Sequence, residues 1–233
     1  MEISGDGIMD RPQETATYDV RHIRDLRRLV ALGEGQCLEF KRKANFPDKI
    51  VREMVAFANS EGGTLLLGVG DDGELAGLKH PEDDAHVVRK ALLRCRPKLD
   101  VQEEFISLGN GRTIIRYLIA EGQRKPYFQV DGLRKLFFLR VKDQSIRASR
   151  EMQEIVRRAR KKKDIRFHYG EHEKALIEYL DQHSSITLER FAELSGLKRF
   201  YASRKLVVLV LANVLRVTPH EKGDIYSLAF GKE

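Results

Sequence analysis

The most constraining feature of this sequence is a short, almost wholly apolar segment, TLLLGV at Thr64–Val69. A segment that is apolar on both faces is typical of a strand covered on both sides at the centre of a sheet. Two glycines at 62 and 63 precede it, and GDDGE at 70–74 follows it as a turn. The segment therefore predicts an α+β unit built around a buried central strand.

The neighbouring segments alternate between helical and strand periodicity. Apolar residues recur at intervals of three and four after residue 18 and again after residue 47, where Pro and an acid open the helix. Alternation over 36–42 predicts a strand with one polar face. Together they predict a single mixed sheet with helices through roughly residue 148. The other expected elements are a return strand at 75–78, a helix at 83–95 and strands at 105–108, 113–120 and 135–141.

The last third of the chain has a different pattern. Residues 149–163 predict a basic connector helix, and three helices followed by a hairpin come after it. This order predicts a small winged helix, whose third helix begins at Lys198. The run 206–215 is so apolar and β-branched that the boundary between helix and strand stays open. The predicted organisation is a disordered tail at 1–17, a domain with its basic connector at 18–166, and a winged-helix domain at 167–233.

Composition narrows the class of protein. Forty-two Lys and Arg against 35 Asp and Glu give a net charge of +7 and an isoelectric point near 9.4. Most of that excess falls between 150 and 166. Two cysteines, Cys37 and Cys95, cannot form a disulfide framework, so we expect a reducing compartment, the cytoplasm. We expect no membrane partner and no signal peptide, because no apolar stretch is long enough and the start is acidic and polar.

Two blocks of sequence carry a family resemblance. The first runs from GEGQCLEFK to AFANSEGGTLLLGVGDDGELAGL, and the second is KLFFLRVKDQSIRAS at 135–149. In this order they resemble the Schlafen/AlbA_2 family over roughly residues 18–160. The resemblance implies an α+β nucleic-acid-binding domain. Some members are metal-dependent ribonucleases with two fused lobes, whereas this chain has one; many prokaryotic members are described as DNA-binding regulators, often with a winged helix after the domain.

Three acids form the sharpest candidate site: Glu34, Glu39 and Asp71. Nuclease chemistry needs two or three carboxylates around Mg²⁺ or Mn²⁺, which polarises a phosphate and activates water. If the strands that carry Glu39 and precede Asp71 are neighbours, all three acids can meet at one sheet edge. The resemblance places the acids of ribonuclease-type members at these positions, and Lys41 shares the face of Glu39, where it would hold a phosphate. The alternative is a surface salt bridge from Glu39 and a turn aspartate.

Two groups of basic residues are candidates for contacts with nucleic acid. One follows the connector, and the other opens the predicted recognition helix, whose N-terminal residues usually meet the major groove. The alternatives are a solvated helix face for the first group and a dimerisation surface for the second. The first comprises Arg157, Arg158, Arg160, Lys161, Lys162 and Lys163, and the second Lys198, Arg199, Arg204 and Lys205.

These features predict a nucleic-acid-binding protein, DNA-directed and regulatory, in which connector cations hold phosphates and the recognition helix reads base edges. The alternative is a metal-dependent endoribonuclease that acts on structured RNA through the three acids, so enzymatic activity stays open. A third possibility is a dimeric interaction module without a nucleic-acid partner. Because relatives of the nuclease type clasp RNA between two lobes, a homodimer is expected if one lobe per chain is to build the same groove.

Overall fold

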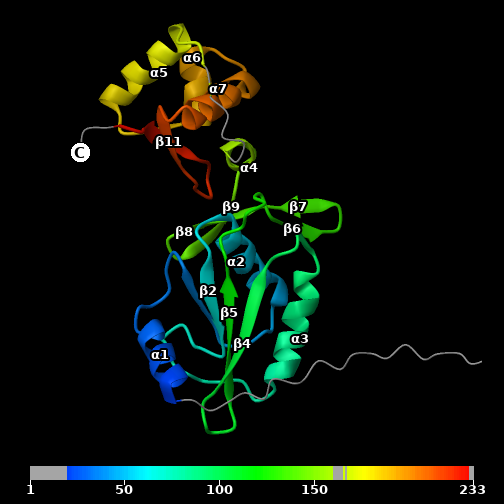
Figure 1. Ribbon diagram of the computed structural model, residues 1–233. Coiled ribbons are helices and arrows are strands. Elements are labelled where there is room, and N and C mark those ends of the chain that lie inside the picture. Colours follow the sequence, from blue (N-terminus) through cyan, green and yellow to red (C-terminus); the bar gives the residue numbers. More distant parts are fainter. Residues whose placement is uncertain (1–19, 160–164, 166, 231–233) are drawn as a thin grey trace, which may run out of the picture.

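The structure is a computed structural model that describes residues 20–159, 165 and 167–230. The predicted tail at 1–17 and the basic residues at 160–163 lie outside the described residues. Figure 1 shows a larger unit of helices and strands, a smaller unit beside it, and the helix α4 (Arg150–Ala159) between them. This mixture confirms the α+β class. None of the described helices has the length and apolar character needed to cross a membrane.

Four strands form the central sheet of the larger unit: β1 (Leu38–Lys41), β2 (Gly63–Leu67), β4 (Val101–Ser107) and β5 (Thr113–Ile119). Their order is β1-β2-β5-β4, with β1 and β2 parallel and the other two pairs antiparallel. The strand β2 holds most of the apolar segment, and Leu65, Leu66 and Leu67 are completely buried in it. The prediction of a buried central strand is confirmed.

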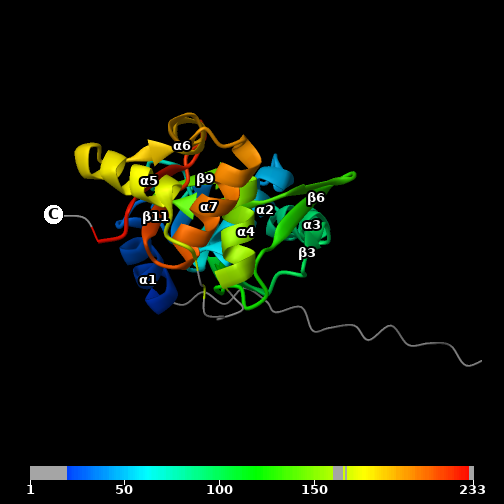
Figure 2. The same cartoon turned by 90° about the horizontal axis from the view of Figure 1, so that it is seen from above.

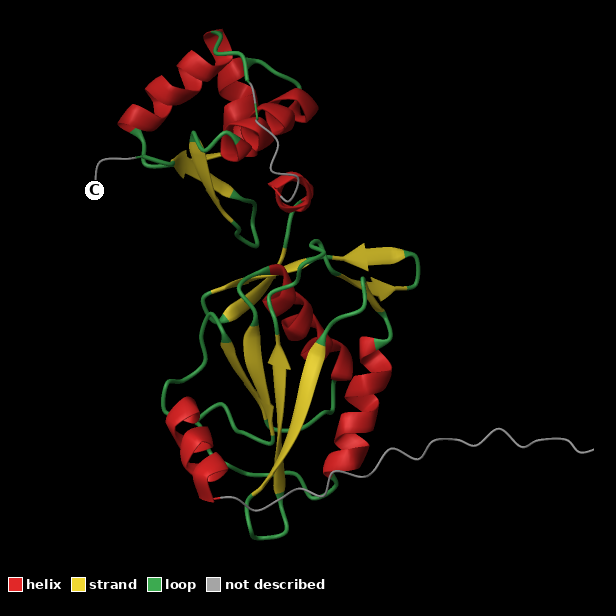
Figure 3. Cartoon of the chain, in the orientation of Figure 1, coloured by secondary structure: helices red, strands yellow, loops and turns green. Residues whose placement is uncertain are grey.

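Three helices cover this sheet: α1 (Val20–Val30), α2 (Pro47–Asn59) and α3 (Pro81–Leu92). Leu65 and Leu67 pack with the apolar residues of α2 and α3, whereas Leu66 packs with Leu26 of α1. Side chains alternate across a strand, so β2 supplies two separate cores on its two faces. Figures 1 and 3 accordingly show α1 and α3 on opposite sides of the sheet.

The turn between α2 and β2 shows why the chain has AFAN at 56–59 and two glycines at 62 and 63. The Asn59 side chain is buried and donates to the carbonyls of Tyr127 and Phe138, at 2.9 and 3.0 Å. Gly62 has a positive φ of 80°, and a Cβ there would lie 2.8 Å from the backbone oxygen of Ile119. Gly63 lies against the ring of Phe57, so a Cβ would clash there as well. These motif residues therefore hold the scaffold together.

Five short strands form two further sheets: β3 (Cys95–Arg96), β6 (Phe128–Asp131), β7 (Arg134–Leu136), β8 (Phe138–Val141) and β9 (Gln144–Arg147). The orders are β3-β6-β7 and β8-β9, both antiparallel. The central sheet is mixed as expected, but it is not the only sheet. The predicted strand at 135–141 divides at Phe137, whose buried side chain enters a core with residues of α4.

Two predicted elements need correction. Residues 75–78 form no strand, because the chain closes instead through the N–H of Gly77 donating to the carbonyl of Gly68 at 2.8 Å. Only Leu78 reaches the sheet there, in an isolated bridge to Thr113. The third helix ends at Leu92 rather than at Cys95, which lies in β3 and pairs with Gln129 of β6.

The smaller unit contains α5 (Glu171–Gln182), β10 (Ile186–Thr187), α6 (Leu188–Ser195), α7 (Arg199–Leu211), β11 (Leu215–Thr218) and β12 (Ile225–Leu228). Its strands form the antiparallel sheet β10-β12-β11, and its helices share one core with them. Thr187 caps α6 as expected by accepting from the N–H of Arg190 at 3.3 Å. The three helices and the hairpin lie where they were expected, and their assignment as a winged helix stays a prediction.

The helix α4 packs along α7, and Figure 2 shows the two helices side by side. Val207 of α7 is buried in a core with Met152 and Ile155 of α4 and with Leu139 of β8. Polar contacts support this junction: Ser203 donates to Glu151 at 2.7 Å, and the hydroxyl of Ser149 donates to Asp224. The predicted domain boundary near residue 166 falls beside residues outside the described ranges and stays a prediction.

Candidate nucleic-acid interface

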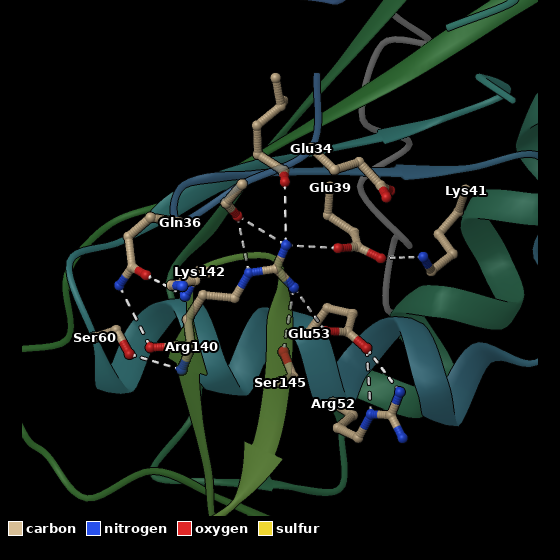
Figure 4. A network of polar contacts seen from close by, with 12 residues as sticks. Glu34, Gln36, Glu39, Lys41, Arg52, Glu53, Ser60, Arg140, Lys142 and Ser145 are labelled. Carbon is tan, nitrogen blue, oxygen red and sulfur yellow. Dashed lines mark hydrogen bonds and ion pairs between the residues drawn. The ribbon is translucent and has the colours of Figure 1, made fainter. Parts of the chain in front are cut away.

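A buried arginine organises the part of the larger unit where the three acids were expected to act. Arg140, from β8, has no exposed side-chain surface and pairs with Glu39 of β1 at 2.7 Å and with Glu53 of α2 at 3.1 Å. Its guanidinium also donates to the carbonyls of Gly35 and Leu38. Figure 4 shows these contacts converging on one side chain. We call this set, with Lys41 and Arg52, the Arg140 network.

Glu39 is buried and has two cationic partners. Besides Arg140, it accepts from Lys41, which also donates to the carbonyl of Phe40 at 2.8 Å. Burial raises the pKa of the Glu39 carboxyl, and its contacts with Lys41 and Arg140 oppose that rise. The alternative of a salt bridge with Lys41 and a nearby Arg is therefore present in the structure, although it is buried rather than on the surface.

Glu34 and Asp71 are placed differently from Glu39. The Glu34 carboxylate accepts from the backbone N–H of Phe40 at 2.8 Å, so it fastens the turn that leads into β1. It lies to one side of the Arg140 network in Figure 4. Asp71 is exposed and lines a shallow hollow of about 440 Å³ against the end of α1.

The expected neighbours β1 and β2 are adjacent, yet the acids do not converge. Among the described residues, which include all three acids, no group of three His, Cys, Asp or Glu side chains is arranged to hold a metal ion. As placed, the donor set does not fit Mg²⁺ or Mn²⁺, because Glu39 is already paired with two cations. Metal binding by Glu34, Glu39 and Asp71 stays a prediction from the sequence.

Sequence reasoning missed Arg140 and Glu53. Each interrupts an apolar pattern: Arg140 stands in FFLRV, and Glu53 stands on the buried face of α2. A charged residue at a position that periodicity assigns to the core is a signal for a buried ion pair, since such charges are rarely buried unpaired. The partner could not be found from the sequence, because the two residues are 87 positions apart.

Basic side chains gather at the junction of α4 and α7. A groove of about 650 Å³ runs between the two helices, and we call it the α4/α7 groove. It contains two of the predicted cations of α7 and one of α4, together with Arg150, which sequence reasoning did not include. Its lining residues are Arg150, Glu151, Glu154, Arg158, Arg199, Phe200, Ser203, Arg204 and Val207.

The charges of the α4/α7 groove are unequal. Four arginines face two glutamates, and each glutamate already has partners. Glu154 makes a two-pronged contact with Arg157, and Glu151 accepts from Ser203 and lies 3.9 Å from Arg199. Within the described ranges, Arg150, Arg158 and Arg204 have no carboxylate partner. The groove therefore presents positive charge that the described residues do not neutralise.

The other predicted basic residues have different surroundings. Lys205 pairs with the buried Glu173 of α5, so its charge is neutralised within the smaller unit. Lys198 is exposed at the start of α7, and Arg157 is occupied by Glu154. Arg160 and Lys161, Lys162 and Lys163 lie outside the described residues, so the structure places none of them.

No curated protein matches the chain. A crystallised protein of Corynebacterium diphtheriae is 15% identical with a TM-score of 0.45; the match covers 90% of this chain and 38% of that one. The N-terminal domain of a Nitrosomonas europaea protein described as related to the ATP-dependent DNA helicase RecG is 21% identical with a TM-score of 0.38, over 64% of this chain and 97% of that one.

The family model described as Schlafen, AlbA_2 matches residues 34–149. That span begins at Glu34 and ends at Ser149, and so it includes the central sheet, the Gly-Gly turn and the whole Arg140 network. It stops just before α4, so the α4/α7 groove lies outside the matched residues. Through residues 34–149, this chain belongs to the Schlafen AlbA_2 family.

Proposed function

We propose that this protein binds nucleic acid and acts as a DNA-directed regulator. The observation that carries the proposal is the positive charge of the α4/α7 groove, which no described carboxylate neutralises at Arg150, Arg158 and Arg204, beside the exposed start of α7. Cations that lack acidic partners are available to phosphates, and phosphate contacts supply most of the affinity of proteins for nucleic acid. Membership of the Schlafen AlbA_2 family supports the same class of partner.

The order of elements in the smaller unit supports a role for α7 in DNA recognition. Its first turn presents Arg199, Phe200 and Tyr201 to solvent, whereas Ala202 and Leu206 are buried. In helix-turn-helix proteins the residues at the start of the second helix contact base edges. The arginines of α4, which packs along α7, would then hold the neighbouring phosphates and set the orientation of the helix.

The test is a salt series of duplex DNA binding, measured by fluorescence anisotropy. In Arg150→Ala/Arg204→Ala, two phosphate contacts are lost, so affinity falls for all sequences and the salt slope decreases by about 2. The matched control is Arg24→Ala/Arg28→Ala, which removes two exposed arginines of α1 at the other end of the molecule. Equal losses in both variants, or binding without salt dependence, contradict the proposal; salt-independent binding favours a protein interaction module.

The expected homodimer is part of this proposal, because a two-fold pair of α7 helices would match a DNA site with two half-sites. Light scattering on the purified chain at micromolar concentration measures it directly. The endoribonuclease stays the second candidate, since Glu39 lies on β1 and Asp71 lies in the turn after the neighbouring strand β2. Its test is whether Mn²⁺ induces RNA cleavage that disappears in Glu39→Gln and Asp71→Asn.

A further inference from the structure

The α4/α7 groove has features beyond general attraction for a phosphate backbone. We propose that it binds one nucleotide, with the base stacked on Phe200 and the phosphate held by Arg150, Arg158 and Arg204. The nucleotide can be a free nucleoside phosphate or one unit of a single strand, since both offer the same chemistry. The inference rests on the proposed function only for the single-strand source.

The cations come from two different helices, and this makes a pocket for phosphate instead of a charged helix face. Arg150 and Arg158 are on α4, and Arg204 is on α7, with the space between them lined by all three. The acids of the same groove are already engaged, Glu154 by Arg157 and Glu151 by Ser203. Among the described residues, none of these three arginines is in an ion pair. A phosphate that enters the groove can therefore bind them without breaking one.

The aromatic group is exposed beside those cations. Phe200 is 64% exposed, and the Arg204 guanidinium lies 5.6 Å from its ring centroid. Tyr201 meets the ring edge-on at 5.5 Å, which limits its freedom to turn. An exposed aromatic ring next to arginine is the arrangement on which proteins stack the bases of single strands, because every base offers a flat aromatic face. Duplex DNA cannot use this ring in the same way, since its bases are already stacked.

The groove has the size and lining for such a ligand. Its volume of about 650 Å³ lies within the range of about 300–1,000 Å³ typical of small-molecule sites. Val207 and the ring of Phe200 supply an apolar wall, whereas the arginines supply the polar contacts. Apolar walls with a few convergent charged groups are typical of sites that orient a small ligand.

The experiment is calorimetric titration of the full chain with three probes: adenosine monophosphate, a short single-stranded oligonucleotide and inorganic phosphate. We expect one or both nucleotide probes to bind more tightly than inorganic phosphate. Phe200→Ala should weaken nucleotide binding by about tenfold, the worth of one stacked base. Phe200→Tyr should restore it. The control is Phe46→Ala, because Phe46 is also 64% exposed and also lies near a cation, Lys49, at 4.8 Å.

Several outcomes overturn the proposal. They are equal binding of inorganic phosphate and adenosine monophosphate, equal effects of Phe200→Ala and Phe46→Ala, or an unchanged affinity in Arg158→Ala/Arg204→Ala. A preference for the oligonucleotide over the monophosphate identifies the strand as the source, and the reverse identifies the free nucleotide. Duplex DNA is titrated in parallel with the parent protein. If the parent protein binds the nucleotide probes but not duplex DNA, the proposed function alone is contradicted. If it binds duplex DNA but neither nucleotide probe, this inference alone is contradicted.

Discussion

Two sets of arginines in this molecule differ in what surrounds them. Arg140 has no exposed side-chain surface and meets two carboxylates and two backbone carbonyls. Arg150, Arg158 and Arg204 line an open groove and, within the described ranges, meet no carboxylate of their own. The residue type is the same, and the surroundings decide between a structural role and a binding role.

The difference concerns where the charge is neutralised. A buried cation needs its partners inside the protein, because transfer from water without them costs several kcal/mol. An exposed cation is hydrated and can exchange water for an external phosphate at little cost. The Arg140 network therefore contributes to the fold, whereas the charge of the α4/α7 groove is available for the recognition that we propose.

The largest effect should come from Arg140→Met. The substitution leaves Glu39 and Glu53 buried without their shared cation and removes the donor to Gly35 and Leu38. Breaking a buried pair by removing one partner costs about 3–5 kcal/mol, so we expect a loss of that size in the free energy of unfolding. Urea denaturation at neutral pH measures it.

Two controls make this result specific. Arg134→Met changes an exposed arginine of β7, so its free energy of unfolding should stay within about 0.5 kcal/mol of the parent protein. The triple change Glu39→Gln/Glu53→Gln/Arg140→Met removes the stranded charges and should recover part of the loss. If Arg140→Met is as stable as Arg134→Met, the network does not hold the fold.

The buried network also shows where sequence reasoning succeeds and where it stops. Local patterns were sufficient for β2 and for the cap of α6 at Thr187, because both depend on neighbours in the chain. Local patterns also indicated Lys41 as a partner of Glu39. They could not indicate Arg140, which lies 101 positions away and contacts Glu39 only in the folded chain. The α4/α7 groove likewise forms by packing of segments that are distant in the sequence, because Arg150 and Arg199 on its two walls are 49 positions apart.

The second prediction concerns the connector, where Arg158 is described and Lys161 and Lys162 lie outside the described residues. Charge reversal of all three to Glu should weaken nucleic-acid binding for every sequence alike. Each lost phosphate contact lowers the salt slope by about 1, so the slope should decrease by about 3. An unchanged slope in anisotropy titrations would show that this run is only a solvated helix face.

The third effect is smaller and depends on pH. Burial raises the pKa of the Asp224 carboxyl above its ordinary value of 3.8, with Glu151 and Glu189 adding to the rise and the Ser149 hydroxyl opposing it. The folded state then binds this proton more readily than the unfolded state. The contribution of the protonated Asp224 carboxyl to stability is therefore full below pH 3.8, and it is lost as pH rises through the pKa of the folded state.

Asp224→Asn keeps the acceptor for Ser149 and removes the titration. We expect a small gain in the free energy of unfolding at neutral pH, below about 1 kcal/mol, and a flatter dependence on pH in the acid range. Thermal melts at a series of pH values compare the two proteins. A destabilised variant with an unchanged pH profile would mean that the charge of Asp224 is needed at the junction of α4 and the smaller unit.

The smallest expected effect is that of Mn²⁺, which should leave the melting temperature of the parent protein unchanged and should not induce cleavage of RNA. An ion that binds the folded state raises its stability, so an unchanged melt reports the lack of a site. To ligate an ion, Glu39 would have to leave Arg140 and Lys41, and Glu34 would have to release the N–H of Phe40. The opposite result is also specific: a manganese-dependent rise, accompanied by RNA cleavage, that disappears in Glu39→Gln and Asp71→Asn but persists in the exposed control Asp181→Asn. It would show that the Arg140 network opens to admit a metal, and the endoribonuclease would then be the better account of this surface.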